Sequence, residues 1–405
     1  MADLFERDAL IHDWNAAEAL GGERPFSLLD DTLRDGLQST IVKQPPLAER
    51  AELLAAMARA NVASVNLGLP VVSRAVFASI EELAREARRL GLGVVVAGRT
   101  LEADMRAIVE LAQKLGFALE GHAFVGASAI RAEVEGWSVE LVRERTSNAL
   151  GMLARAGLEA VFVTEDTTRS HPETLRTLFR AALDAGATRL CLCDTVGHAT
   201  PDGVRRLVQF TRAVALEHGS KVTLDWHGHA DRGLALPNAL AALDAGVDRV
   251  HGTALGLGER AGNTPIELLA LNLSLDGRWP RDLVPMVEYC RRAAAVLGVT
   301  VPATHPLLGD AAFRTATGVH AAALQKAAQK AAWLSDRVYG AVPSAVVGRS
   351  QEVRVGPLSG RANVEAWLTA RGRRVAEPLV RRILEHARAA DHVLGEDELL
   401  RLLEP

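Results

Sequence analysis

Short apolar runs alternate along this chain with segments whose apolar residues recur every three to four positions. This alternation predicts parallel strands joined by helices, because a strand covered on both sides has no polar face. The predicted strands are FSLLDDT near 26–32, VASVNLG near 62–68, GVVVAGR near 93–99, HAFVGAS near 122–128, AVFVTED near 160–166, RLCLCDT near 189–195, KVTLDWHGH near 221–229 and RVHGTAL near 249–255.

The segments between these runs carry helix signals. After the fifth run, apolar residues fall at i, i+3, i+4 and i+7 behind Pro172 in the first turn, namely Leu175, Leu178, Phe179 and Ala182. After the sixth run, Thr200 is expected to cap a helix that starts at Pro201. Glycines at 186, 219 and 246 are expected to end helices.

Eight such units within roughly 255 residues predict an α/β fold, a closed (β/α)8 TIM barrel. An open doubly wound sheet is the alternative, and the number of units favours closure. A TIM barrel places its chemistry at the carboxyl ends of the strands.

Composition and charge exclude several classes of function. Hydrophobic residues make up 48% of the 405 residues, charged residues 24%, and the net charge is −4, so nothing indicates a nucleic-acid partner. No apolar run approaches the roughly 18 residues of a membrane span, and the N-terminus lacks the apolar core of a signal peptide. The three cysteines form no CxxC pair and are expected to be buried and reduced, which indicates the cytoplasm.

Polar side chains gather where the predicted strands end. The seventh run ends in HGH, and residues i and i+2 of a strand point to one face, so His227 and His229 are expected to converge. Two imidazoles with a nearby carboxylate suit a divalent metal ion. The acidic residues and histidines at the outlets of four strands are Asp30, Asp35, Glu165, Asp166, Asp194, His227 and His229.

Several motifs then suggest a family. DTLRDGLQ, TEDTTR, DTVGHATP, HGHADRGLALPN and GLGERAGN, followed by LLGDAAFRTATGVH, VYGAVPSAVVG and LSGRANV, occur in this order between about residues 25 and 370. Together they resemble the 2-isopropylmalate, homocitrate and citramalate synthase branch of the DRE-TIM metallolyases. The resemblance implies an N-terminal extension (1–24), a catalytic barrel (25–277) and small, mostly helical C-terminal linker subdomains (278–405).

The resemblance also implies roles for individual residues. It assigns a divalent ion (Mg²⁺, Mn²⁺ or Zn²⁺) to Asp35, His227, His229 and Asn263, and catalysis to Arg34, Glu259, His320 and Tyr339. It places substrate contacts at Gln38, Asn66, His122, Ser128, Arg131, Glu165 and Thr195. Since His320 and Tyr339 match residues delivered from a second subunit, it implies a homodimer whose linker subdomains complete the partner's active site.

The reaction implied by this resemblance is a Claisen-type condensation of an acyl-CoA, usually acetyl-CoA, with a 2-oxo acid. The absence of a regulatory domain after Pro405 implies that leucine feedback is not expected. Three departures from the family pattern bear on the substrate: Asn66 replaces a glutamate, Leu37 replaces a polar residue, and HGHAD stands for the usual HxHND. Loss of a negative charge at Asn66 favours a more anionic oxo acid, of the homocitrate or phosphonomethylmalate type.

Two other functions stay open. RDGLQ is similar to the hydroxymethylglutaryl-CoA lyases, which implies a carbon–carbon lyase or aldolase as one alternative. The three departures leave a barrel without catalysis as another. Structural roles also stay open for single residues: Arg34 as an ion-pair partner of Asp194, and Asp194 as a support for the site.

Overall fold

The computed structural model describes residues 10–11 and 25–404, and its centre is a closed barrel of eight parallel strands. Each strand pairs with its neighbours in sequence, and the first pairs with the last. The strands are β1 (Ser27–Asp30), β2 (Ser64–Asn66), β3 (Gly93–Arg99), β4 (Glu120–Gly126), β5 (Glu159–Glu165), β6 (Arg189–Asp194), β7 (Thr223–Gly228) and β8 (Arg249–Gly252). The predicted TIM barrel is therefore confirmed.

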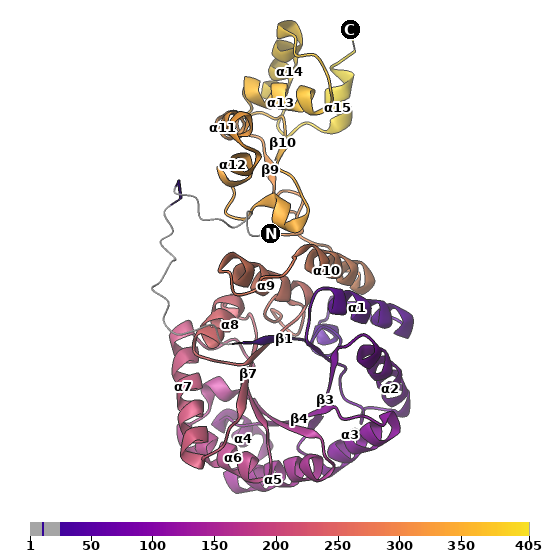
Figure 1. The fold of residues 1–405 in the computed structure, drawn as a ribbon, viewed down its shortest axis with the longest axis vertical. Helices are drawn as coiled ribbons and strands as arrows, with labels where there is room; N and C mark the ends of the chain where they lie inside the picture. The colour runs from indigo at the N-terminus through magenta and orange to yellow at the C-terminus, as the bar shows by residue number, and fades with distance from the viewer. Residues whose placement is uncertain (1–9, 12–24, 405) are drawn as a thin grey trace. The chain divides into compact units, whose positions relative to one another are not determined.

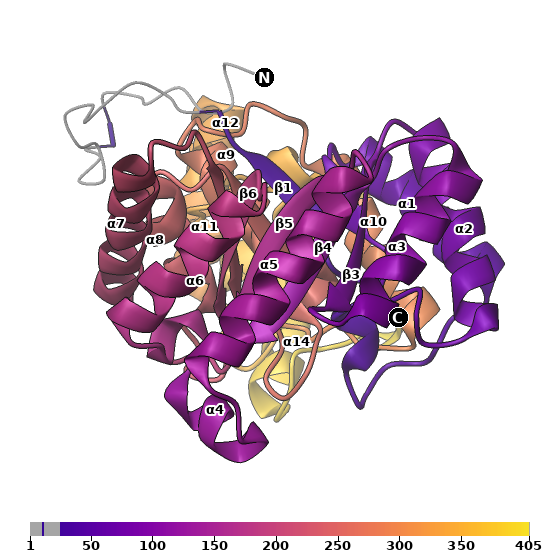
Figure 2. The same cartoon turned by 90° about the horizontal axis from the view of Figure 1, so that it is seen from below.

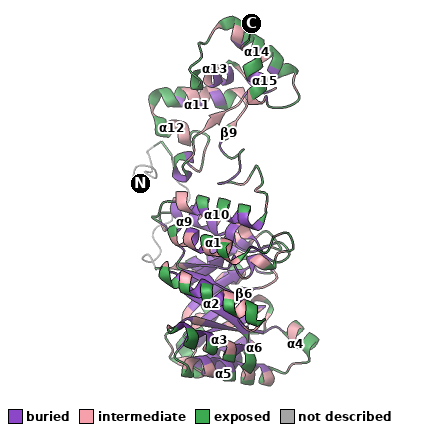
Figure 3. Cartoon of the chain, turned by 90° about the vertical axis from the view of Figure 1, so that its right-hand side faces the viewer, coloured by how far each residue is buried: buried purple, intermediate pink, exposed green. Residues whose placement is uncertain are grey.

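Helices surround the barrel, as Figure 1 shows in a view along the strands. Their outer faces are exposed and the strands are buried (Figure 3), which explains the apolar runs in the sequence. The helices are α1 (Leu47–Arg59), α2 (Arg74–Arg89), α3 (Glu102–Leu115), α4 (Ala129–Glu135), α5 (Val139–Arg155), α6 (Pro172–Asp184), α7 (Pro201–His218), α8 (Ala235–Asp244), α9 (Ile266–Leu275) and α10 (Val284–Leu297). Short α4 follows β4 and lies at the margin of the barrel in Figure 2.

The helix signals in the sequence match the structure. Helix α6 starts at Pro172 and buries its predicted apolar stripe, and the Thr200 hydroxyl caps α7 by accepting a hydrogen bond from the Gly203 amide at 3.3 Å. Gly219 ends α7 with a φ of 78°, a left-handed conformation in which glycine is favoured. No helix in the described part of the chain is long and apolar enough to span a membrane.

The described residues divide into two compact units. One contains the barrel, with residues 25–281 and 288–300, and the other contains residues 10–11, 282–287 and 301–404. The second unit holds further helices around a small core that includes Val364, Trp367 and Ile383, which confirms the mostly helical C-terminal region. Its elements are β9 (Arg314–Thr315), α11 (Gly318–Lys330), α12 (Ala332–Arg337), β10 (Glu352–Val353), α13 (Arg361–Ala370), α14 (Glu377–Ala389) and α15 (Glu396–Arg401).

The amino-terminal half of the barrel interior holds buried charges instead of a purely apolar core. Arg249 of β8 donates through Nε and Nη2 to Asp225 of β7, at 2.9 and 2.7 Å, and through both terminal nitrogens to Glu120 of β4. Arg189 of β6 donates to Asp225 at 2.7 Å. Burial alone would raise the pKa of Asp225, but Arg249, His251 and Arg189 hold that pKa well below its usual range. This network forms the floor beneath the candidate site.

Candidate metal centre and active site

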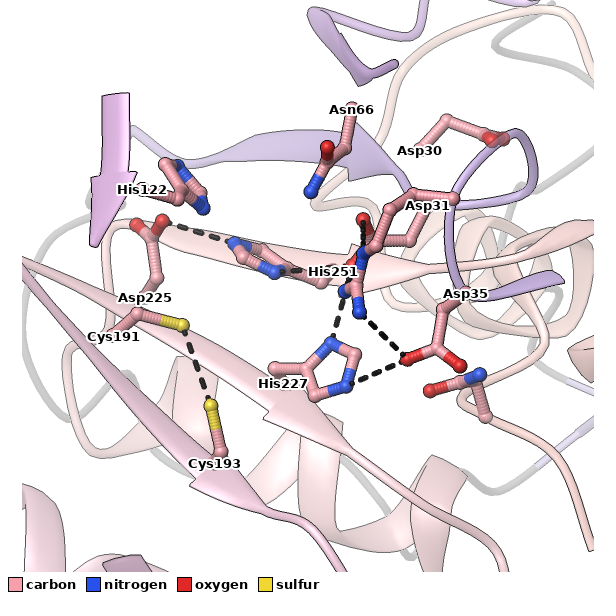
Figure 4. A network of polar contacts seen from close by, with 12 residues as sticks. Asp30, Asp31, Asp35, Asn66, His122, Cys191, Cys193, Asp225, His227 and His251 are labelled. Atoms are coloured by element: carbon pink, nitrogen blue, oxygen red, sulfur yellow. Dashed lines mark hydrogen bonds and ion pairs between the residues drawn. The ribbon is translucent and has the colours of Figure 1, made fainter. Parts of the chain in front are cut away.

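The predicted metal ligands converge at the carboxyl ends of β1 and β7. These strands flank β8 in the barrel, so the loop after β1 and the end of β7 come together. One Asp35 oxygen lies 3.2 Å from His227 Nε2 (Figure 4). The same oxygen lies 3.7 Å from His229 Nε2, and the two Nε2 atoms lie 3.2 Å apart. All three side chains are buried, and their ligand atoms lie within 4.8 Å of one another. These residues can together hold a metal ion.

The electrostatics of this cluster favour a cation. Burial would lower the pKa of His227, but hydrogen bonds to Asp31 and Asp35 raise it to about 10. Burial and the neighbouring His227 lower the pKa of His229 to about 4. The negative potential that stabilises a proton on His227 would equally stabilise a metal ion between the same groups.

Polar atoms without protein partners also fit a bound ion. Asp35 Oδ1 and Asn263 Oδ1 are buried and accept no hydrogen bond, although buried polar atoms are normally satisfied. The Asn263 amide nitrogen donates to the Leu257 carbonyl at 3.1 Å, which fixes the orientation of the side chain, and His229 pairs with Asn263 in an isolated bridge. The residues present therefore fit the ion that the resemblance implies.

Gly258 explains part of the GLGERAGN motif. A Cβ atom at this position would lie 2.0 Å from Asn263 Nδ2 and 3.3 Å from Asp35 Oδ1. A side chain there would displace the asparagine, so the loop needs glycine to bring its backbone against the cluster. Gly228, between the two histidines, is constrained in the same way, because its Cβ would lie 2.8 Å from Trp226 Nε1. This contact is a physical reason why the middle residue of HGH is small.

Arg34 lies beside the cluster and is held by two carboxylates. Its Nε and Nη2 atoms lie 3.3 and 2.9 Å from the two oxygens of Asp31, and Nη1 lies 3.3 Å from Asp35. Asp194 takes no part in this pairing. It accepts hydrogen bonds from Thr168 and from the amides of His198 and Ala199, and so supports the loop after β6.

Three predicted substrate contacts belong to β2, to β4 and to the residue after β6. Asn66 is buried at the end of β2 and accepts from the Gly68 amide at 3.1 Å. His122 is buried on β4 with its ring stacked 5.8 Å from that of His251, and burial lowers its pKa. The Thr195 hydroxyl accepts from the Asp166 amide at 2.7 Å.

Arg131 and Glu165 form an ion pair after β4 and β5. Arg131 Nε lies 2.9 Å from Glu165, and Nη1 lies 3.0 Å from Glu135. Arg131 lies on the short helix α4, and the Ser128 hydroxyl caps this helix by accepting a hydrogen bond from the Arg131 amide. Arg131 therefore already faces two carboxylates, and an anionic substrate group would have to compete with them.

The remaining predicted residues are exposed. Gln38 ends the short 3-10 helix Gly36–Gln38, and the Glu259 carboxylate lies 3.6 Å from Arg260. His320 and Tyr339 belong to the second unit, where their rings lie 4.0 Å apart. The structure thus brings the rings of His320 and Tyr339 together, and their common catalytic role stays a prediction.

Sequence reasoning missed a set of buried or half-buried residues beneath the metal centre: Asp31, Glu120, Asp225, Arg249 and His251. A signal for them exists, since polar residues two positions apart occupy the inward face of each strand. Glu120 and His122 on β4, Asp225 and His227 on β7, and Arg249 and His251 on β8 follow this spacing. Asp30, by contrast, faces away from the cluster and accepts from the Tyr289 hydroxyl at 2.6 Å.

Comparisons with known proteins agree with this geometry. The chain is 30% identical over 383 residues to a 2-isopropylmalate synthase of Pyrococcus furiosus, covering 93% of this chain and 74% of the relative. It is 29% identical over 366 residues to a homocitrate synthase of Methanopyrus kandleri, covering 89% of this chain and 86% of the relative. These relatives confirm the resemblance to the synthase branch of the DRE-TIM metallolyases.

Solved structures share the barrel. Hydroxymethylglutaryl-CoA lyase from Pseudomonas aeruginosa matches with a TM-score of 0.58 at 23% identity, covering 68% of this chain and 94% of that one. Likeness at this level of identity shows the fold alone. The family described as HMGL-like matches residues 25–289 of the 405, which is more than half of the chain. The chain therefore belongs to the HMGL-like family.

Proposed function

We propose that this protein is an acyltransferase that condenses acetyl-CoA with a 2-oxo acid and releases CoA, in the manner of the 2-isopropylmalate and homocitrate synthases it resembles. One observation carries the proposal: Asp35, His227 and His229 converge beside Arg34, with Asp35 Oδ1 and Asn263 Oδ1 lacking protein partners. Synthase relatives aligned over most of the chain support the reaction class.

The centre would hold a divalent ion, Mg²⁺, Mn²⁺ or Zn²⁺, through Asp35, His227 and His229, with Asn263 beside it. Such an ion polarises a ketone oxygen as a Lewis acid. Arg34 lies beside the three ligands and can donate a hydrogen bond to the ketone oxygen. Its positive charge stabilises the negative charge that develops on that oxygen when a carbon nucleophile attacks the ketone. The carboxylates of Asp31 and Asp35 raise the pKa of Arg34, which keeps its guanidinium charged.

The acyl-CoA must lose a proton from its α-carbon to become the nucleophile. His320 or Glu259 is the base we propose, because a base needs a side chain that can reach the substrate from outside the buried cluster. Both side chains are exposed in the single chain. Water then hydrolyses the thioester of the condensed product, which releases CoA and makes the overall reaction favourable.

We further propose a homodimer in which His320 and Tyr339 act at the partner's barrel. The chain neighbours of this ring pair are exposed apolar residues: Val319, which precedes His320, is 74% exposed, and Val338, which precedes Tyr339, is 39% exposed. Apolar side chains of this size in one region are typical of a surface that another chain covers.

The 2-oxo acid is the open part of the proposal. The test is a free-thiol assay with acetyl-CoA, Mn²⁺ and a panel of 2-oxoisovalerate, 2-oxoglutarate, pyruvate, oxaloacetate and phosphonopyruvate. We expect CoA release that needs both the metal and one oxo acid. A lack of release with every acid would contradict the proposal, and acetoacetate formed from hydroxymethylglutaryl-CoA would favour a lyase instead.

Arg34→Lys tests the proposed catalytic arginine. Lysine keeps the charge but cannot reproduce the planar fork of the guanidinium, so kcat/KM should fall by about 100-fold or more. Arg212→Lys is the matched control, because Arg212 also makes an ion pair and carbonyl contacts, but near the amino-terminal end of the strands. The control should change kcat/KM by less than about threefold.

A further inference from the structure

A buried carboxylate whose only part in the proposed mechanism is to keep Arg34 charged lies directly behind the metal centre. Asp31 has no solvent exposure, and three functional groups face it. Its Oδ2 atom lies 2.9 Å from Arg34 Nη2, 3.2 Å from His227 Nδ1 and 3.4 Å from His251 Nδ1. Its Oδ1 atom accepts from Arg34 Nε at 3.3 Å.

We propose that Asp31 is a positioning residue that holds the metal ligand His227 and the guanidinium of Arg34 in fixed orientations relative to one another. This inference rests on the proposed function. Asp31 is not among the residues that the resemblance assigns, and it contacts both the metal ligand His227 and Arg34.

The contact with His227 decides which ring nitrogen is available to a metal. A carboxylate accepts hydrogen bonds, so His227 donates to Asp31 from Nδ1 and keeps its proton there. Once the second proton leaves the ring, Nε2 presents its lone pair toward Asp35 and His229, which lie on the other side of the ring. Carboxylates placed behind ligating histidines fix the tautomer and the ring plane in this way.

The contact with Arg34 decides which edge of the guanidinium is free. Asp31 occupies the edge formed by Nε and Nη2, in a two-point arrangement that restricts rotation of the planar group. The Nη1 atom is directed to the metal side, where it lies 3.3 Å from Asp35. A substrate oxygen bound near the ion would therefore meet the Nη1 edge.

The position of Asp31 is itself fixed by the buried network that forms the floor of the site. His251 contacts Asp31 through Nδ1 and Asp225 through Nε2, at 3.4 and 3.0 Å (Figure 4). Asp225 is in turn held by Arg249 and Arg189. The chain of contacts from Asp225 through His251 to Asp31 is buried throughout, so Asp31 has no room to turn away from its partners.

A second ion between Asp31, His227 and His251 is the competing interpretation, because their ligand atoms lie close enough. The positive charge of Arg34 argues against it. Arg34 lies against both oxygens of Asp31, at 2.9 and 3.3 Å, so such an ion would share a buried oxygen with the guanidinium, and two cations so placed repel strongly. Asp35, by contrast, keeps its Oδ1 atom free for the first ion. We therefore expect one ion for each chain.

The test is titration of the metal-free protein with Mn²⁺, in which electron paramagnetic resonance measures the free ion. The wild type should bind one Mn²⁺ per chain, and Asp31→Asn should weaken this binding about 10- to 100-fold. Asp30→Asn is the matched control, since this neighbouring carboxylate is equally buried but faces Tyr289, and an amide of the same shape can keep the hydrogen bonds with Tyr289 and the Thr32 amide. The control should leave Mn²⁺ affinity within about threefold of the wild type.

His251→Asn is the second variant, and it serves if Asp31→Asn fails to fold. It removes the support behind Asp31 and should weaken Mn²⁺ binding by a smaller factor, about 3- to 10-fold, without changing the stoichiometry. Unchanged affinity in the folded Asp31→Asn or His251→Asn protein would overturn the positioning role. Two ions in the wild type and one in His251→Asn would establish the second metal site instead. No Mn²⁺ binding by the wild type would refute the proposed function rather than the role of Asp31.

Discussion

At the scale of single residues, the site depends on positions where almost no other side chain fits. Gly258 is the clearest example, because a Cβ atom there would lie 2.0 Å from the Asn263 amide nitrogen. Gly258→Ala should therefore displace Asn263 and weaken Mn²⁺ binding at least about 10-fold, since groups around a metal tune its affinity by such factors. Titration with Mn²⁺ measures this directly.

The control for this variant is Gly219→Ala at the end of α7. Gly219 has a left-handed φ of 78° and nothing within 4 Å of its Cβ position, so alanine costs only backbone strain, about 1 kcal/mol of folding free energy. Its Mn²⁺ affinity should match that of the wild type. Equal affinities in both variants would show that the loop tolerates a side chain at Gly258.

Asp30 should make stability depend on pH. Burial raises its pKa to about 6, from 3.8 in the unfolded chain. The hydrogen bonds from Tyr289 and Thr32 lower this pKa, and the negative charge of Asp31 raises it further. A group with a raised pKa stabilises the fold fully below pH 3.8, and this contribution is lost as the pH rises to about 6. The loss corresponds to about 3 kcal/mol.

Asp30→Asn should remove that dependence. The difference in unfolding free energy between wild type and variant, measured by urea denaturation, should shift by about 2 to 3 kcal/mol in favour of the variant between pH 4 and pH 7. Since the variant and the wild type share every other titrating group, the subtraction isolates Asp30. A difference that stays constant with pH would contradict the raised pKa.

At the scale of elements, the strands contribute two kinds of inward-facing residue. Positions near the carboxyl ends of the strands carry the metal centre. Positions near their amino-terminal ends carry the ion network around Arg249, which links β4, β7 and β8. Arg249→Met should destabilise the protein by about 3 to 5 kcal/mol, because it leaves Glu120 without its cation and weakens the pairing of Asp225. Urea denaturation provides the measurement.

Arg205→Met is the corresponding control on α7. Arg205 pairs with Asp202 on the surface, where the two side chains are 43% and 78% exposed. Surface pairs contribute less than about 1 kcal/mol, so this variant should unfold near the wild-type midpoint. A small effect of Arg249→Met would mean that water or rearrangement compensates the buried carboxylates.

The helices and strands also show which parts of the fold and of the site can be predicted from the sequence. The barrel was predictable because each strand is a short apolar run followed by a helical stripe, and because eight such units favour closure over an open sheet. Asp35, His227 and His229 were predictable from motif and i, i+2 geometry. Asp31 and His251 were not identified, because their importance comes from contacts between strands far apart in sequence, such as the 3.4 Å approach of these two side chains.

At the scale of the whole molecule, the proposed homodimer predicts complementation. Asp35→Asn removes a metal ligand from one barrel, and His320→Asn removes from the second unit one of the two side chains proposed as the base. If each active site draws His320 from the partner subunit, a mixed dimer contains one site with neither defect. An equal mixture of the two inactive variants should therefore recover about a quarter of wild-type activity after subunit exchange.

The thiol assay measures this recovery, and each variant alone serves as the control. Sedimentation should show dimers in all samples. Recovery would be absent if His320 served the barrel of its own chain, because every site in the mixed dimer would then carry one defect or the other.

The link between Asp30 and Tyr289 bears on how a shortened version of this protein should be designed. Tyr289 lies on α10, after the last β/α unit, and its hydroxyl contacts both Asp30 and Thr32 at the start of the loop that carries Arg34 and Asp35. A fragment cut at the end of α9 would retain all eight barrel strands but lose this anchor. An engineered minimal barrel should therefore keep the chain through Leu297, so that Tyr289 still holds the loop that carries Arg34 and Asp35.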